Sequence, residues 1–154
     1  MPTSSLGRKK CVILVVEDDG DDVNLLQRAL NKASSACDLQ VEMLVTRNGM
    51  EALSSVASDD LKTSLPNIVV VDLNMPILSG EDFLRLLRTE LRLPSLPAVV
   101  LTTSREKPVH DAALAAGADQ VFVKPETTLE LESIAREIVE IGVRRASELS
   151  RRPV

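Results

Sequence analysis

Short apolar runs alternate with longer segments of helical periodicity along most of this chain. Three of the runs are continuous and rich in Val or Ile, as expected of strands that are buried on both faces of a sheet. They are Cys11–Val16, Asn67–Asp72 and Ala98–Thr102. A further strand is predicted at Gln120–Val123. The run Leu39–Val45 alternates apolar with mostly polar residues, which favours a strand at the edge of the sheet.

Between the predicted strands, apolar residues recur at a spacing of three or four, which predicts helices with one buried side. Asn48–Gly49 marks a turn, Pro108 suits the start of a helix, and Gly117 can cap its end. Thr127 and Glu130 have the spacing of a capping box before the final helix. The predicted helices are 21–34, 50–57, 81–92, 109–116 and a final one whose apolar side carries Leu131, Ile134, Ala135, Ile138 and Ile141.

Five strands and five helices in strict alternation predict an α/β fold, with a doubly wound parallel sheet covered by helices on both faces. The length of 154 residues suits one domain. We place this domain at residues 11–143, after a flexible polar lead-in at residues 1–10. A basic tail at residues 144–154 follows, and its charge complements the dipole of the last helix.

Composition and charge narrow the range of functions. A net charge of −5 argues against nucleic acid as a partner, and only Phe83 and Phe122 are aromatic, so no base-stacking platform is expected. No apolar run approaches the length of about 20 residues that a membrane span needs, and Glu17–Asp19 interrupts the first run too early for a signal peptide. Cys11 and Cys37 are expected to be reduced thiols in a cytoplasmic protein.

Polar side chains directly follow four of the predicted strands. Glu17 and Asp18 come after the first strand, and Asp72 ends the third. Thr102 ends the fourth strand and Lys124 follows the fifth. Each has an ordinary explanation when taken alone, since acidic loops are usually solvated and a threonine or lysine can simply end a strand. Because ligands of open parallel sheets bind at the carboxyl ends of the strands, the joint pattern predicts one site.

Three neighbouring carboxylates repel one another, which raises the pKa of at least one of them unless a cation neutralises the cluster. Mg²⁺ suits such oxygen ligands and usually also binds water and a phosphate oxygen. Neither G-x-x-x-x-G-K-[ST] nor G-x-G-x-x-G occurs, so no nucleotide cradle is predicted. The phosphoryl group would then come from elsewhere and end on a side chain, and aspartate is a known covalent acceptor. Lys124 and Thr102 could hold its oxygens.

Four segments resemble the motifs of the receiver domains of two-component response regulators. They are Leu14–Asp19, Val71–Pro76 with Gly80, Leu101–Thr103 and Val123–Pro125. Their order and spacing agree with that family across residues 11–143. The resemblance implies a flavodoxin-like fold with the strand order 2-1-3-4-5.

The resemblance also implies a role for each metal-site residue. Asp72 is similar to the phosphoacceptor of these domains, which becomes an aspartyl phosphate. Asp18 is similar to the residue that binds Mg²⁺ directly together with the acceptor. Glu17 would act through a water molecule, and the backbone carbonyl of Asn74 would complete the protein ligands.

The remaining implied roles concern the switch. Thr102 is similar to the switch hydroxyl and Lys124 to the lysine that contacts the phosphoryl group. Val121 stands where the family often has an aromatic residue, with Phe122 next to it. We therefore expect the output to depend on the loop around Thr102, or on an interface, in place of an aromatic toggle. Ser104 and Asn74 stand at positions that set the dephosphorylation rate in the family.

By the same resemblance, the chain is expected to be a signalling phosphoacceptor in a phosphorelay that catalyses only its own phosphorylation and dephosphorylation. Its partner would be a sensor histidine kinase. No output domain is expected after the last helix, so the chain would bind a target protein or pass the group to a phosphotransfer protein. Glu17–Asp22 and Leu101–Ser104 look similar to small regulators that are paired with phytochrome-type histidine kinases and often form homodimers through the last strand and helix.

Three alternatives share the predicted architecture. The first is a phosphatase that resembles haloacid dehalogenases, but such enzymes use Asp-x-Asp and here Asn74, an amide that cannot shuttle protons, stands two residues after Asp72. The second is a flavodoxin-like cofactor binder, for which two phenylalanines offer few stacking partners. The third is a receiver-like scaffold that is never phosphorylated, against which the complete set of acceptor-site residues argues.

Overall fold

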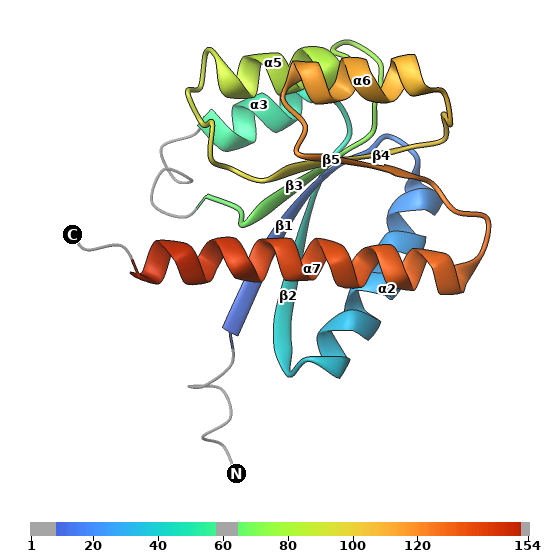
Figure 1. The fold of residues 1–154 in the computed structure, drawn as a ribbon, viewed down its shortest axis with the longest axis vertical. Coiled ribbons are helices and arrows are strands. Elements are labelled where there is room, and N and C mark those ends of the chain that lie inside the picture. The colour runs from blue at the N-terminus through green and yellow to red at the C-terminus, as the bar shows by residue number, and fades with distance from the viewer. Residues whose placement is uncertain (1–8, 58–64, 152–154) are drawn as a thin grey trace.

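The computed structural model describes residues 9–57 and 65–151, in which helices and strands alternate around one sheet (Figure 1). The strands of this described part are parallel and lie in the order β2-β1-β3-β4-β5. They are β1 (Lys9–Val16), β2 (Leu39–Thr46), β3 (Ile68–Val71), β4 (Ala98–Thr102) and β5 (Gln120–Val123). The predicted doubly wound fold and its strand order are confirmed, as is the edge position of β2.

Helices cover both faces of the sheet. In the described residues they are α2 (Gly20–Ala36), α3 (Gly49–Ala57), α5 (Gly80–Arg88), α6 (Lys107–Ala116) and α7 (Thr128–Arg151). Helices α2 and α7 pack together on one face, while α5 lies between α3 and α6 on the other (Figure 1). None of the helices in these two stretches of chain is long and apolar enough to cross a membrane.

The sheet separates two hydrophobic layers. Side chains of β1 alternate between them, with Ile13 facing α2 and α7 and Leu14 facing the other three helices. Phe122 lies in the first layer and its neighbour Val121 packs against the second, so Phe122 does not take over the place of the missing aromatic residue. Cys11 is fully buried in the first layer, and its burial raises the pKa of the thiol to about 11.

Helix α5 ends at Arg88, although the apolar periodicity predicted a helix up to Arg92. The N–H of Leu91 donates to the carbonyl of Leu86 at 3.0 Å, which spans five residues and is wider than a helical turn. Arg92 then has a φ of 53°. The periodicity continued past the helix because Leu91 packs on the same hydrophobic layer from an irregular turn.

Other features also differ from the prediction or refine it. Strand β1 begins at Lys9, inside the predicted lead-in, because it pairs with β2 from that residue onward; residues 1–8 of the lead-in lie outside the described residues. The alternation in β2 also breaks at its end, where Val45 is exposed and Thr46 is buried. Helix α7 continues to Arg151, so most of the predicted tail is helical, and residues 152–154 lie outside the described part.

Candidate functional site

The carboxyl ends of four strands bring the predicted site residues to one edge of the sheet. The sheet's hydrogen bonding continues one residue past the strands. The N–H of Glu17 donates to Thr46 at 2.9 Å, and that of Asp72 to Val16 at 3.0 Å. The N–H of Lys124 likewise donates to the carbonyl of Thr102. The hydrogen bonding of the sheet therefore holds the backbone at Glu17, Asp72 and Lys124.

The acidic cluster consists of Glu17, Asp18 and Asp72, which each offer a carboxylate oxygen within 4.8 Å of the others. Glu17 and Asp72 are buried and Asp18 is exposed. The pKa of Glu17 is raised to about 7, mainly by burial; the hydrogen bond with Lys124 lowers it, and the neighbouring carboxylate of Asp72 raises it. The donor set is made of carboxylate oxygens, which fits a hard divalent cation.

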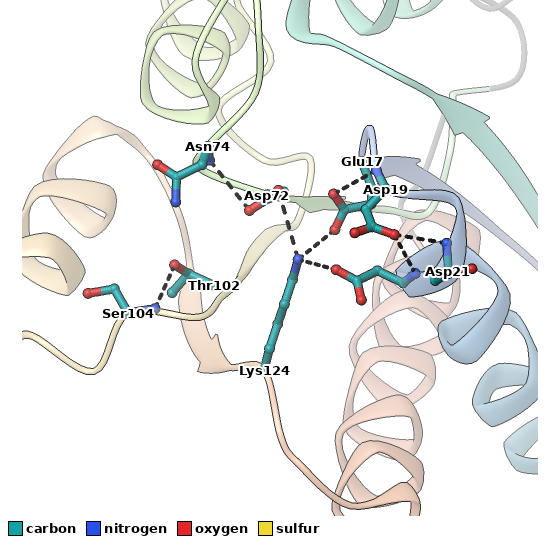
Figure 2. Close-up of polar contacts among 9 residues, drawn as sticks. Glu17, Asp19, Asp21, Asp72, Asn74, Thr102, Ser104 and Lys124 are labelled. Carbon is teal, nitrogen blue, oxygen red and sulfur yellow. Dashed lines mark hydrogen bonds and ion pairs between the residues drawn. The ribbon is translucent and has the colours of Figure 1, made fainter.

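Lys124 supplies the positive charge that balances this cluster. Its Nζ lies 2.7 Å from Oε1 of Glu17, 2.8 Å from Oδ2 of Asp22 and 3.8 Å from Oδ2 of Asp72. Figure 2 shows the lysine side chain extending from β5 toward Glu17 and Asp72. Burial lowers the pKa of Lys124, but the hydrogen bonds with Asp22 and Glu17 outweigh this effect and raise it above its ordinary value. The lysine is therefore a permanent cation in the site.

Asn74 and Thr102 lie on the other side of Asp72 from Glu17 (Figure 2). The N–H of Asn74 donates to Oδ1 of Asp72 at 3.4 Å. The hydroxyl of Thr102, a fully buried residue, accepts the N–H of Ser104 at 3.2 Å. A ring nitrogen of His110 on α6 contacts the carbonyl of Ser104 at 2.7 Å. The loop that carries Ser104 is therefore tied both to the site and to the next helix.

Asp22 and Asp19 also belong to the site, although the sequence alone gave neither residue a role of its own. The Asp19 side chain caps α2 by accepting the N–H groups of Asp21 and Asp22 at 2.9 and 3.2 Å. This cap begins the helix directly behind the cluster and places Asp22 beside Lys124. The available signal was an N-cap aspartate followed by an acidic residue at the third helical position, at the carboxyl end of a strand.

We expect the affinity of the site for a divalent cation to rise with pH up to about 7. Metal binding requires the Glu17 carboxylate without its proton. Below this pKa, the dissociation constant for Mn²⁺ should therefore fall about tenfold for each unit by which the pH is increased. In the metal-free protein the raised pKa has the opposite consequence. The folded state holds a proton that the unfolded state releases above the ordinary glutamate pKa of 4.5, so this contribution to stability declines between pH 4.5 and about 7.

Calorimetric titration with Mn²⁺ at several pH values measures how the affinity of the site for the ion depends on pH. Glu17→Gln, which cannot ionise, should bind the ion more weakly and with a flatter pH profile. An unchanged slope in Glu17→Gln would assign the titration to another group.

Comparison of the sequence with known protein families agrees with the geometry of the site. The sequence model of the response regulator receiver domain matches residues 13–136. The fold and this match therefore define the class of the domain as a receiver of two-component signalling. The chain belongs to the response regulator receiver domain family. This membership disfavours the phosphatase and the flavin binder. A phosphorylated receiver and a receiver-like scaffold are the two alternatives that agree with it.

Two curated relatives illustrate the sequence similarity. The chain is 31% identical over 98 residues to response regulator Rcp1 of Synechocystis sp., which covers 62% of this chain and 64% of Rcp1. It is 33% identical over 119 residues to the transcriptional regulatory protein PrrA of Mycobacterium tuberculosis, covering 77% of this chain and 46% of PrrA. The chain thus matches less than two thirds of the length of each of these proteins.

Two solved structures are similar over most of the chain. The Mn²⁺-bound form of Rcp1 is 27% identical with a TM-score of 0.70, covering 83% of this chain and 91% of that one. The phosphorylated cyanobacterial phytochrome response regulator RcpA is 27% identical with a TM-score of 0.74, covering 89% of this chain and 95% of RcpA. Receiver domains bind divalent metal, and the acidic cluster of this chain fits such an ion.

Proposed function

We propose that this chain is a response regulator that accepts a phosphoryl group on Asp72 from the phosphohistidine of a sensor histidine kinase. The observation that supports it most is the meeting of a buried aspartate, an acidic cluster and the Lys124 ammonium, 3.8 Å from that aspartate, at one sheet edge. A carboxylate oxygen of Asp72 forms the new bond to phosphorus. The phosphorus–nitrogen bond breaks, and its electron pair returns to the histidine ring, which takes up a proton from solvent.

The proposed reaction depends on Mg²⁺. Asp18 and Asp72 would bind it directly, Glu17 through water, and Asn74 through its backbone carbonyl. When bound, Mg²⁺ supplies positive charge that offsets the carboxylates and the incoming phosphoryl oxygens. The protein catalyses only its own phosphorylation and dephosphorylation, so the chemistry of its residues is limited to positioning and charge.

The output follows from the added charge. A phosphoryl group carries about −1.5 to −2 charges at neutral pH, and it attracts the Lys124 ammonium and the Thr102 hydroxyl. Because the Ser104 N–H is bonded to Thr102, movement of that hydroxyl displaces the loop that His110 ties to α6. With Val121 in place of an aromatic residue, this loop is the element that we propose to carry the change to the surface.

The proposed partner is a histidine kinase of the phytochrome type, since RcpA is described as a phytochrome response regulator. The phosphorylated form would bind a target protein or a phosphotransfer protein in the cytoplasm. A homodimer through β5 and α7 is part of the same proposal, because β5 is an edge strand and its Phe122 shares a hydrophobic layer with α7.

Incubation with acetyl phosphate, followed by intact-mass measurement, tests the acceptor. We expect a gain of one phosphoryl group in the presence of Mg²⁺, no gain with EDTA and no gain in Asp72→Ala. The control is Asp21→Asn, which removes an exposed carboxylate of the same acidic stretch and should be phosphorylated normally. No gain by the unaltered chain, from acetyl phosphate or from a phosphorylated kinase, would favour the scaffold alternative.

A further inference from the structure

Lys124 is closer to two other carboxylates than to the proposed acceptor. Its Nζ is within hydrogen-bond distance of Glu17 and Asp22, at 2.7 and 2.8 Å, but stands 3.8 Å from the nearest oxygen of Asp72. In the structure without a phosphoryl group the ammonium is thus directed toward α2 and the end of β1. A phosphoryl group on Asp72 needs that same ammonium.

We infer that Asp22 is a positioning residue that holds Lys124 in the resting state and competes with a phosphoryl group on Asp72 for the ammonium. The inference rests on the proposed function and adds a residue to it. Among the described residues no hydrogen bond joins Asp22 to Asp72, so Asp22 acts through the lysine. Its presence lowers the stability of the phosphorylated state relative to the resting state.

The surroundings of Lys124 leave the ammonium few other partners. Beside it lies a cavity of about 60 Å³ whose lining away from the carboxylates is apolar. Its apolar lining includes Val15, Leu26, Val70, Leu101 and Leu131. A charged ammonium is not stabilised by such a surface. When the contact with Asp22 is lost, Glu17 and Asp72 are the carboxylates that already lie within 4 Å of the ammonium.

The exposure of the two partners makes the exchange reversible. The Asp22 side chain is 38% exposed, so water can solvate its carboxylate once the lysine leaves. Glu17, at 8%, is almost completely buried and cannot lose its counter-charge as easily. Asp22 is therefore the partner that Lys124 releases first, and the loss of this one ion pair sets the size of the effect.

Binding of beryllium trifluoride, a mimic of an acyl-bound phosphoryl group, tests the competition at saturating Mg²⁺. We expect Asp22→Asn to bind the mimic about fivefold more tightly than the unaltered chain, the effect of one partly exposed ion pair. Asp21→Asn removes the same charge from the adjacent residue in the sequence. It should change the affinity by less than about twofold, because an exposed charge that is not bonded to Lys124 is screened by solvent and salt. Asp22→Glu, which keeps a carboxylate, should return the affinity toward that of the unaltered chain.

A second measurement separates this inference from the proposed function. In metal-free protein, unfolding of Asp22→Asn, Lys124→Met and the double variant should be non-additive, because each single change removes the same contact. If the unaltered chain does not bind the mimic, the proposed function fails, and additive effects would then also remove Asp22 as a partner of Lys124. If the chain binds the mimic but Asp22→Asn behaves like Asp21→Asn or binds more weakly, the competition is disproved while the acceptor role stands.

Discussion

Replacing Gly80 with alanine is expected to lower the free energy of unfolding by about 3 kcal/mol and to impair phosphorylation of Asp72. A Cβ on Gly80 would overlap the backbone carbonyl oxygen of Asp72 and come within 2.9 Å of the Cα of Leu73. Backbone atoms cannot move aside as a flexible side chain can. The Gly80 N–H also donates to the carbonyl of Leu73 at 3.1 Å, so the start of α5 is fastened to the acceptor segment.

The matched control is Gly20→Ala at the start of α2, where an added Cβ would meet nothing within 4 Å. Alanine should be neutral there or stabilise the protein by up to about 1 kcal/mol. Chemical denaturation of both variants gives the stabilities, and acetyl phosphate labelling of the folded fraction gives the effect on the acceptor. Equal stability of the two variants would show that the loop after β3 can relax away from the added methyl group.

The strands and the site edge could be predicted from sequence because both depend on short-range patterns. Strands buried on two faces need continuous apolar runs, and β3, which is buried along its whole length, is the clearest case. The polar residue that ends such a run is forced to the carboxyl edge of a parallel sheet. For that reason Glu17, Asp72 and Lys124 could be expected to meet although they are far apart in sequence. Their roles in phosphoryl transfer stay predictions until the acceptor is tested.

Features that depend on contacts across the fold were not predictable in the same way. Leu91 has the periodicity of α5 but packs from an irregular turn after the helix has ended. The acidic stretch after β1 suggested solvated charge, and only the orientation of the helix N-terminus distinguishes Asp22, which bonds to Lys124, from the exposed Asp21. Hydrogen bonds between a long side chain and distant carbonyls leave no pattern in the sequence at all.

Arg88 provides such a case, and Arg88→Met is expected to lower the free energy of unfolding by about 3 kcal/mol. The guanidinium donates to the carbonyls of Leu93 and Leu96 at 2.6 and 2.7 Å, and twice to that of Gly117, at 2.8 and 3.1 Å. It also pairs with Asp119 at 3.2 Å. Methionine keeps the apolar stem but leaves these partly buried carbonyls without their charged donor.

Arg85→Met on the same helix is the control, because Arg85 is 55% exposed and, within the described part of the chain, its ion pairs are those with Glu81 and Asp82 on the helix surface. Its loss should change stability by less than about 1 kcal/mol. Arg88→Lys should fall between the two, since an ammonium cannot reproduce the planar fork of a guanidinium. The Arg88 contacts lie at the amino-terminal ends of β4 and β5, away from the acceptor edge. Folded Arg88→Met should therefore still be phosphorylated, unlike Gly80→Ala, and a parallel loss of both properties would show that the two ends of the sheet are coupled.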